Sequence, residues 1–307
     1  MSARPHPLII YIPGLLPKPE PETHRDALLQ CMLAGVSRVD RAVADAIGEQ
    51  PAVFDIVSWT YDFYRTHRDF ELDRAAIDAV VGQRAASEQD VAEATSLRRR
   101  FTRWLYRLGD LLPFLIPHVA SERMEVHLRD LRRYLQDDNG IARHTRRMLK
   151  LRLRAAEEGG HPVLLIAHSM GSVIAYDSLW EMSASGRDHL RLDMLLTMGS
   201  PLGQRYMQKR LKGANERGYA RYPNNIRHWK NLSAVGDLTA LDPVLADDFE
   251  EMLELGLLES FTDDFLLSWF RLEGHLNVHA EYGYLVHEKT ARTIAEWWRG
   301  QDSSLAD

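Results

Sequence analysis

The segment that most constrains the fold is residues 162–177, where an apolar run breaks into a turn of small residues and continues as a helix. The apolar run, Val163–Ala167, is typical of a fully buried strand. It is followed by His-Ser-Met-Gly, with Gly171 two residues after Ser169 and Ala167 two residues before it. Small residues at these positions allow a strand and a helix to meet closely. We therefore expect a tight strand-to-helix turn that holds the Ser169 hydroxyl above the sheet edge.

This turn resembles the nucleophile turn of α/β-hydrolases of the lipase and esterase type, in which His-Ser-Met-Gly and His-Ser-Leu-Gly are common. The usual pattern has glycine where this chain has Ala167. The resemblance implies a single domain over residues 1–307, built on a mostly parallel central sheet flanked by helices. It also implies that a nucleophile, an acid and a histidine follow one another along the chain.

The remaining pattern predicts alternating strands and helices at both ends of the chain, interrupted by a largely helical insertion at about 61–158. The predicted strands, besides the one before Ser169, are Leu8–Ile12, Val53–Trp59, Leu192–Met198, Ile226–Ser233 and one within Leu276–Leu285. The predicted helices outside the insertion are about 24–47, Gly171–Ser183 and Glu288–Trp298.

Two parts of the insertion carry an apolar face with arginines opposite. The helix that leads into the Ser169 strand, at about 143–156, is expected to pack on the sheet. Residues 97–118 are the candidate for a lid over the site, where an apolar wall would favour acyl chains.

A serine hydroxyl needs an adjacent base, and the base needs an orienting group. The carboxyl ends of parallel strands meet at one edge, so the acid should follow the strand at 226–233. Asp237 lies in the loop that leaves this strand and is the predicted acid, and Asp242 is its competitor. Relatives often have an Asn in the strand and an Asp a few residues later, which favours Asp237.

The base should come later in the chain. His279 lies in Val-His-Ala-Glu-Tyr, which resembles the His-x-x-Tyr loop before the terminal helix of this group, and is the predicted base. His275 and His287 are the alternatives. His168, beside Ser169, is expected to have a structural role.

Two backbone N–H groups are the candidate oxyanion donors. Met170 begins the helix after the nucleophile, where the helix dipole favours negative charge. The second donor should come from the loop after the first strand, where Pro13-Gly14-Leu15 stands in place of the His-Gly of many relatives. Leu15 is the first candidate there and Leu16 the second. Ser200–Gly203 resembles a turn that lines the pocket in lipase-like relatives.

Composition excludes several functions. A net charge of −6 argues against a nucleic-acid partner. The single cysteine, Cys31, fits a reducing compartment, and the absence of a leader or of an apolar span of 18 residues predicts a cytoplasmic protein without stable membrane insertion. No Cys/His cluster or glycine-rich phosphate loop is present, so we expect no metal and no organic cofactor.

The sequence thus predicts a serine hydrolase that cleaves a carboxylic ester of a small-molecule or lipid-like substrate through an acyl-enzyme on Ser169. Ser169, Asp237 and His279 would be its catalytic residues. An acyltransferase or thioesterase using the same residues is the first alternative, and a non-catalytic binding protein of the same fold is the second.

Overall fold

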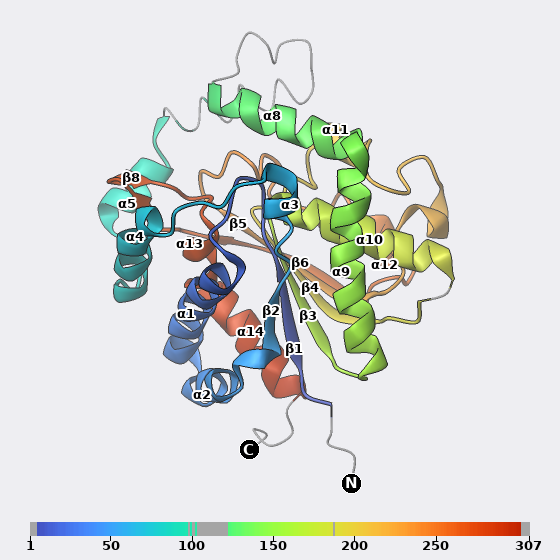
Figure 1. Ribbon diagram of the computed structural model, residues 1–307, viewed down its shortest axis with the longest axis horizontal. Helices are drawn as coiled ribbons and strands as arrows, with labels where there is room; N and C mark the ends of the chain where they lie inside the picture. The colour runs from blue at the N-terminus through green and yellow to red at the C-terminus, as the bar shows by residue number, and fades with distance from the viewer. Residues whose placement is uncertain (1–4, 98, 100–101, 103–121, 187, 302–307) are drawn as a thin grey trace.

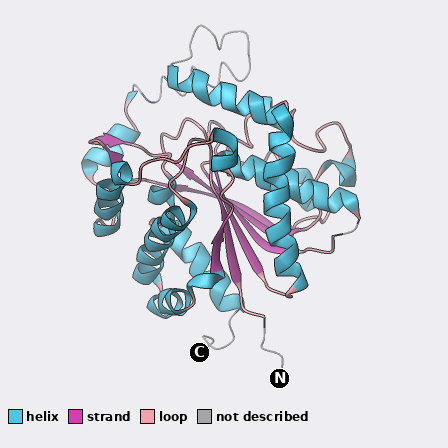
Figure 2. Ribbon diagram, in the orientation of Figure 1, coloured by secondary structure: helices cyan, strands magenta, loops and turns pink. Residues whose placement is uncertain are grey.

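A six-stranded sheet forms the centre of the protein (Figure 2). The computed structural model describes residues 5–97, 99, 102, 122–186 and 188–301. The strands lie in the order β2-β1-β3-β4-β5-β6, and each neighbouring pair is parallel. They are β1 (Leu8–Ile12), β2 (Phe54–Ile56), β3 (Val163–His168), β4 (Leu192–Met198), β5 (Ile226–Ala234) and β6 (Ser260–Leu266). A small antiparallel pair, β7 (Arg271–Leu272) and β8 (His275–Leu276), is separate from this sheet. The predicted parallel sheet flanked by helices is confirmed.

Alternate side chains of the inner strands enter two different cores, because successive residues of a strand point to opposite faces. Ile9 and Tyr11 of β1 belong to one core, and Ile10 and Ile12 belong to the other. Every residue of β3 is buried, as expected for a strand covered on both faces.

Helices from residues 21–82 and 281–301 cover one face, and helices from residues 141–254 cover the other (Figure 1). The first group comprises α1 (Pro21–Val39), α2 (Arg41–Glu49), α4 (Glu71–Gly82), α13 (Glu281–Leu285) and α14 (Glu288–Gln301). The second group comprises α9 (Ile141–Glu158), α10 (Met170–Ser185) and α12 (Glu250–Glu254). The shorter helices are η1 (Pro51–Val53), α3 (Thr60–Tyr64), α5 (Glu88–Ala94), η3 (Asp138–Gly140), α11 (Arg205–Gln208) and η4 (Gly218–Arg221).

Three predicted elements differ in the structure. The predicted helix at about 24–47 is two helices, because Asp40 leaves the helical conformation and its side chain caps α2 at the N–H of Val43. The predicted strand Val53–Trp59 is reduced to β2, because the turn η1 includes Val53 and the strand ends at Ile56. The predicted strand within Leu276–Leu285 is wrong: Glu281–Leu285 form helix α13, and the sixth strand of the sheet is β6.

The described residues between 61 and 158 form helices and turns without a strand, as predicted for the insertion. Its last helix, α9, packs on the sheet through Leu149 and Leu153. The predicted lid at 97–118 lies outside the described residues, apart from 97, 99 and 102. Among the described residues of the insertion before α9, the longest helix is α8 (Glu122–Leu135). No helix in the described ranges is long and apolar enough to cross a lipid bilayer.

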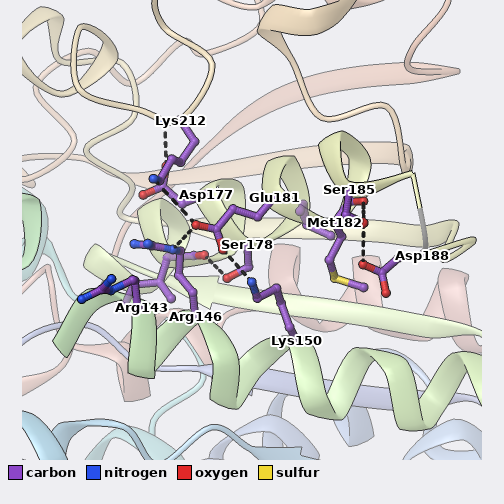
Figure 3. A network of polar contacts seen from close by, with 12 residues as sticks. Arg143, Arg146, Lys150, Asp177, Ser178, Glu181, Met182, Ser185, Asp188 and Lys212 are labelled. Carbon is purple, nitrogen blue, oxygen red and sulfur yellow. Dashed lines mark hydrogen bonds and ion pairs between the residues drawn. The ribbon is translucent and has the colours of Figure 1, made fainter. Parts of the chain in front are cut away.

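A charged network joins α9 to α10 (Figure 3). Arg146 and Lys150 of α9 donate to the Glu181 carboxylate at 2.8 Å and 2.6 Å. One turn earlier on α10, the buried Asp177 accepts hydrogen bonds from the Tyr134 hydroxyl at 3.2 Å and from the Lys212 N–H at 2.9 Å. Burial outweighs these contacts and raises the pKa of Asp177 to about 6.

The raised pKa of Asp177 predicts a pH dependence of stability. An acid whose pKa is higher in the folded than in the unfolded state stabilises the fold below the unfolded pKa, and this contribution is lost as the pH rises through the folded pKa. Relative to Asp177→Asn, the unfolding free energy of the wild type should fall by about 2 kcal/mol between pH 4 and pH 7, as expected for a shift of about two pKa units that is not yet fully expressed at pH 4.

Urea unfolding at several pH values measures this difference. Asp55→Asn is the matched control, because Asp55 is half exposed and pairs with Arg152 at the surface. Parallel pH profiles for the wild type and Asp177→Asn would contradict the assignment.

Candidate functional site

The site lies where the strand order changes direction. From β1 the chain proceeds outward to β2, whereas from β3 it proceeds to the opposite edge, so the loops after β1 and β3 diverge at neighbouring strand ends. Such switch points at the carboxyl ends of parallel strands form ligand-binding crevices in α/β proteins. Ser169 directly follows β3, and Leu15 lies in the loop after β1.

Two glycines allow these neighbouring turns to touch. A Cβ on Gly171 would lie 2.3 Å from the carbonyl oxygen of Ile12, and a Cβ on Gly14 would lie 2.7 Å from the Cβ of Ser169. Both distances are far below van der Waals contact, so any larger residue would push the turns apart. This is the physical reason for the small residue predicted two positions after Ser169.

Ser169 has a strained backbone. Its φ of 54° and ψ of −125° lie in a region that residues with a side chain rarely adopt. Its N–H donates to the Met198 carbonyl at 2.9 Å, and α10 begins at the next residue. The strand and the helix therefore hold the turn from both sides, as the sequence predicts.

His279 joins Ser169 to Asp237. The imidazole Nε2 lies 2.9 Å from the Ser169 Oγ, and Nδ1 lies 2.8 Å from Oδ2 of Asp237. An ionised carboxylate only accepts hydrogen bonds, so Nδ1 carries the proton and Nε2 is left to accept the serine proton. The three residues selected from the sequence are thus brought into one hydrogen-bonded chain.

The Asp237 carboxylate is fully buried and remains ionised. Burial acts to raise its pKa, but the His279 charge and three hydrogen bonds outweigh burial and lower the pKa to about 2. Besides His279, the donors are the Thr239 N–H and the Tyr284 hydroxyl, each at 2.8 Å. The hydroxyl in turn accepts the Ala234 N–H at 2.7 Å, which fixes Asp237 to the end of β5.

The alternative residues lie elsewhere. Asp242 is exposed, and its carboxylate accepts the Val244 N–H at 3.4 Å. His275 is exposed in β8. His287 packs against the Trp269 ring, and burial lowers its pKa to about 4.

The candidate oxyanion donors, the N–H groups of Leu15 and Met170, have no hydrogen-bond acceptor in the described part of the chain. The Leu16 N–H differs from them, because it donates to the Tyr64 hydroxyl at 3.1 Å. Leu16 is therefore already engaged, which leaves Leu15 as the donor that the first loop can offer to a ligand.

His168 is more closely tied to the site than the sequence indicates. Its Nε2–H donates to the backbone carbonyl of His279 at 2.8 Å, so it supports the loop that carries the imidazole. Burial and the neighbouring His279 charge lower the pKa of His168 to about 3, which keeps its ring neutral.

Sequence reasoning missed Glu281, a buried carboxylate two residues after His279. It accepts hydrogen bonds from Lys18 Nζ at 2.7 Å and from the Tyr11 hydroxyl at 2.8 Å, and it lies 3.0 Å from His24 Nε2. Burial acts to raise the pKa of Glu281, but the Lys18 and His24 charges hold it well below the usual range. Glu281 thus ties the His279 loop to β1 and to the loop that follows β1.

The turn after β4 packs against Asp237 and His279. A Cβ on Gly199 would lie 2.9 Å from Oδ2 of Asp237 and 3.1 Å from Nδ1 of His279. The hydroxyl oxygens of Ser200 and Ser172 lie 2.8 Å apart, and Ser200 Oγ accepts the Leu202 N–H at 3.2 Å. Ser200 and the buried Leu202 therefore support α10, and the predicted pocket-lining role of this turn stays a prediction.

The described residues contain no group of three or more His, Cys, Asp or Glu side chains arranged to hold a metal ion. No protein-family model, no curated protein and no solved structure matches this chain.

The strain at Ser169 predicts that a glycine is more stable there than an alanine. Ser169→Ala and Ser169→Gly both remove the hydroxyl, but only glycine adopts a φ of 54° without strain. The unfolding free energy of Ser169→Gly should exceed that of Ser169→Ala by about 1 kcal/mol, because the relief of strain outweighs the greater conformational entropy of glycine in the unfolded chain. Denaturant unfolding of the two variants measures the difference, and an alanine variant of equal or higher stability would contradict the strain.

Proposed function

We propose that the protein is a serine hydrolase of the α/β-hydrolase type that cleaves a carboxylic ester. The observation that carries the proposal is the hydrogen-bonded chain from the Ser169 hydroxyl through His279 to the buried Asp237 carboxylate. Its support is that the serine lies on a strained strand-to-helix turn, with two unengaged N–H groups on the adjoining loop and helix.

In the proposed reaction, Ser169 Oγ attacks the ester carbonyl carbon while Nε2 of His279 takes the hydroxyl proton. The carbonyl oxygen becomes an oxyanion that accepts hydrogen bonds from the N–H groups of Leu15 and Met170. The intermediate collapses, the C–O bond to the alcohol breaks, and Nε2 gives the proton to the departing oxygen. Water then attacks the acyl-enzyme by the same route and releases the acid and the free serine.

The environment of Asp237 suits this role. The imidazole becomes positive in each transition state, and an adjacent ionised carboxylate stabilises that charge and fixes the tautomer. With a pKa of about 2, Asp237 stays ionised through the neutral and mildly acidic range.

The nucleophile is tested with a fluorophosphonate probe and a series of p-nitrophenyl esters of increasing chain length. The wild type should be labelled on Ser169 and should hydrolyse at least one ester, and Ser169→Ala should lose both properties while remaining folded. Mass spectrometry that finds the label on another serine would contradict the proposal.

The acid is tested with Asp237→Asn and its matched control, Asp242→Asn. Asp237→Asn should lower kcat by about 10³- to 10⁴-fold, because the amide no longer holds the imidazole in the required tautomer. Asp242→Asn changes an exposed carboxylate five residues later and should leave kcat within about twofold of the wild type. The reverse pattern would show that Asp242 is the acid.

A further inference from the structure

The loop after β1 contains a residue, Leu16, whose backbone is strained and whose side chain is too exposed to anchor it. Leu16 has a φ of 76°, in the left-handed region that favours glycine, and its side chain is 42% exposed. Such a conformation persists only when surrounding contacts impose it. Leu16 adjoins Leu15, so whatever holds Leu16 also sets the direction of the candidate oxyanion donor.

Helix α3 and the residue before it hold this loop at both ends. The buried Trp59 indole donates to the Pro13 carbonyl at 2.9 Å, and the Tyr64 hydroxyl accepts the Leu16 N–H at 3.1 Å. Leu15 lies between these two contacts in the chain. Its N–H is therefore fixed from outside the loop.

The insertion determines how Tyr64 can act. The Tyr64 hydroxyl donates its proton to Oδ2 of Asp130 at 2.9 Å, and Asp130 is a buried residue of α8. A hydroxyl has one proton, so this contact leaves its lone pairs to accept the Leu16 N–H. Arg133 of α8 also donates to the Phe63 carbonyl at 2.7 Å, and its guanidinium lies 4.2 Å from the Phe63 ring centre. Two consecutive residues of α3, Phe63 and Tyr64, thus form hydrogen bonds with α8.

The same helix also contacts the helix that begins at the nucleophile. Tyr134 of α8 donates to Asp177 of α10 at 3.2 Å. The two candidate oxyanion donors, on the β1 loop and at the start of α10, are therefore connected through α8. Figure 1 shows α8 above the end of the sheet toward which β1 runs.

The geometry points to Tyr64 as a positioning residue that, held by Asp130, lets the helical insertion set the oxyanion donor of the β1 loop. This inference rests on the proposed hydrolase function. Tyr64 touches no reacting atom and acts through Leu16 on Leu15. The insertion is then part of the reaction geometry, in addition to any role as a cover.

The first test compares Tyr64→Phe with Tyr61→Phe, using p-nitrophenyl ester hydrolysis by the full-length protein. Tyr61 lies on the same helix, is exposed and stacks on His67, so Tyr61→Phe is the matched control. Tyr64→Phe should lower kcat by about 10- to 100-fold and change KM by less than about threefold, because the donor acts mainly on the transition state. Tyr61→Phe should stay within about twofold of the wild type.

Asp130 provides a second pair of variants, which decides the matter if Tyr64→Phe does not fold. Asp130→Asn keeps an oxygen that accepts the Tyr64 proton and should retain most of kcat, whereas Asp130→Ala should lose it as Tyr64→Phe does. Equal kcat in Asp130→Ala and the wild type would overturn the inference while leaving the hydrolase proposal intact.

Hydrogen exchange gives a readout that does not depend on activity. In a peptide covering residues 14–18, the Leu16 amide should exchange about 10-fold faster in Tyr64→Phe than in Tyr61→Phe, because it loses its acceptor. Unchanged exchange would overturn the inference whether or not the wild type hydrolyses esters. If the Leu16 amide exchanges faster in Tyr64→Phe but the wild type hydrolyses no ester, the proposed function is rejected and the link between the insertion and the loop is retained.

Discussion

The close contact between the ends of β1 and β3 is the constraint on which the rest of the site depends. Gly171 has no side chain, so α10 begins directly against the carbonyl of Ile12. This contact brings the start of α10, where Met170 lies, against the end of β1. A methyl group at position 171 would need the space that the Ile12 oxygen occupies, and the start of α10 would separate from the β1 loop.

Buried charges hold the remaining parts together, and each has enough partners to offset the cost of its burial. Asp237 fixes His279 to the end of β5, and Glu281 fixes the same histidine loop to β1 and Lys18. Removing one partner of such a group leaves an uncompensated charge, which costs more than the pair contributes. The imidazole is thus positioned from two sides by carboxylates that remain ionised, while the neutral His168 supports its backbone.

The sequence identified the parts of the site that depend on local pattern and chain order, namely Ser169, Asp237 and His279. The sequence did not predict the elements and contacts that depend on tertiary packing. Residues 281–285 are buried throughout, and a short buried run cannot be assigned to a strand or a helix by periodicity. Strand β6 was not predicted, because Asp263 and Asp264 interrupt its apolar pattern. In the structure, Asp263 accepts hydrogen bonds from the N–H groups of Leu245 and Ala246. The contact between Tyr64 and Leu16 spans 48 positions and has no sequence signal.

In the proposed reaction, Ser169 forms a covalent intermediate, and its oxyanion accepts hydrogen bonds from the N–H groups of Leu15 and Met170. A crystal structure of the protein after reaction with an alkyl phosphonate tests it most directly, because the adduct resembles the tetrahedral intermediate. The proposed reaction predicts a phosphorus–Oγ bond at Ser169, with one phosphoryl oxygen about 2.7–3.1 Å from both N–H nitrogens. An adduct on another residue, or a phosphoryl oxygen directed away from both donors, would contradict it.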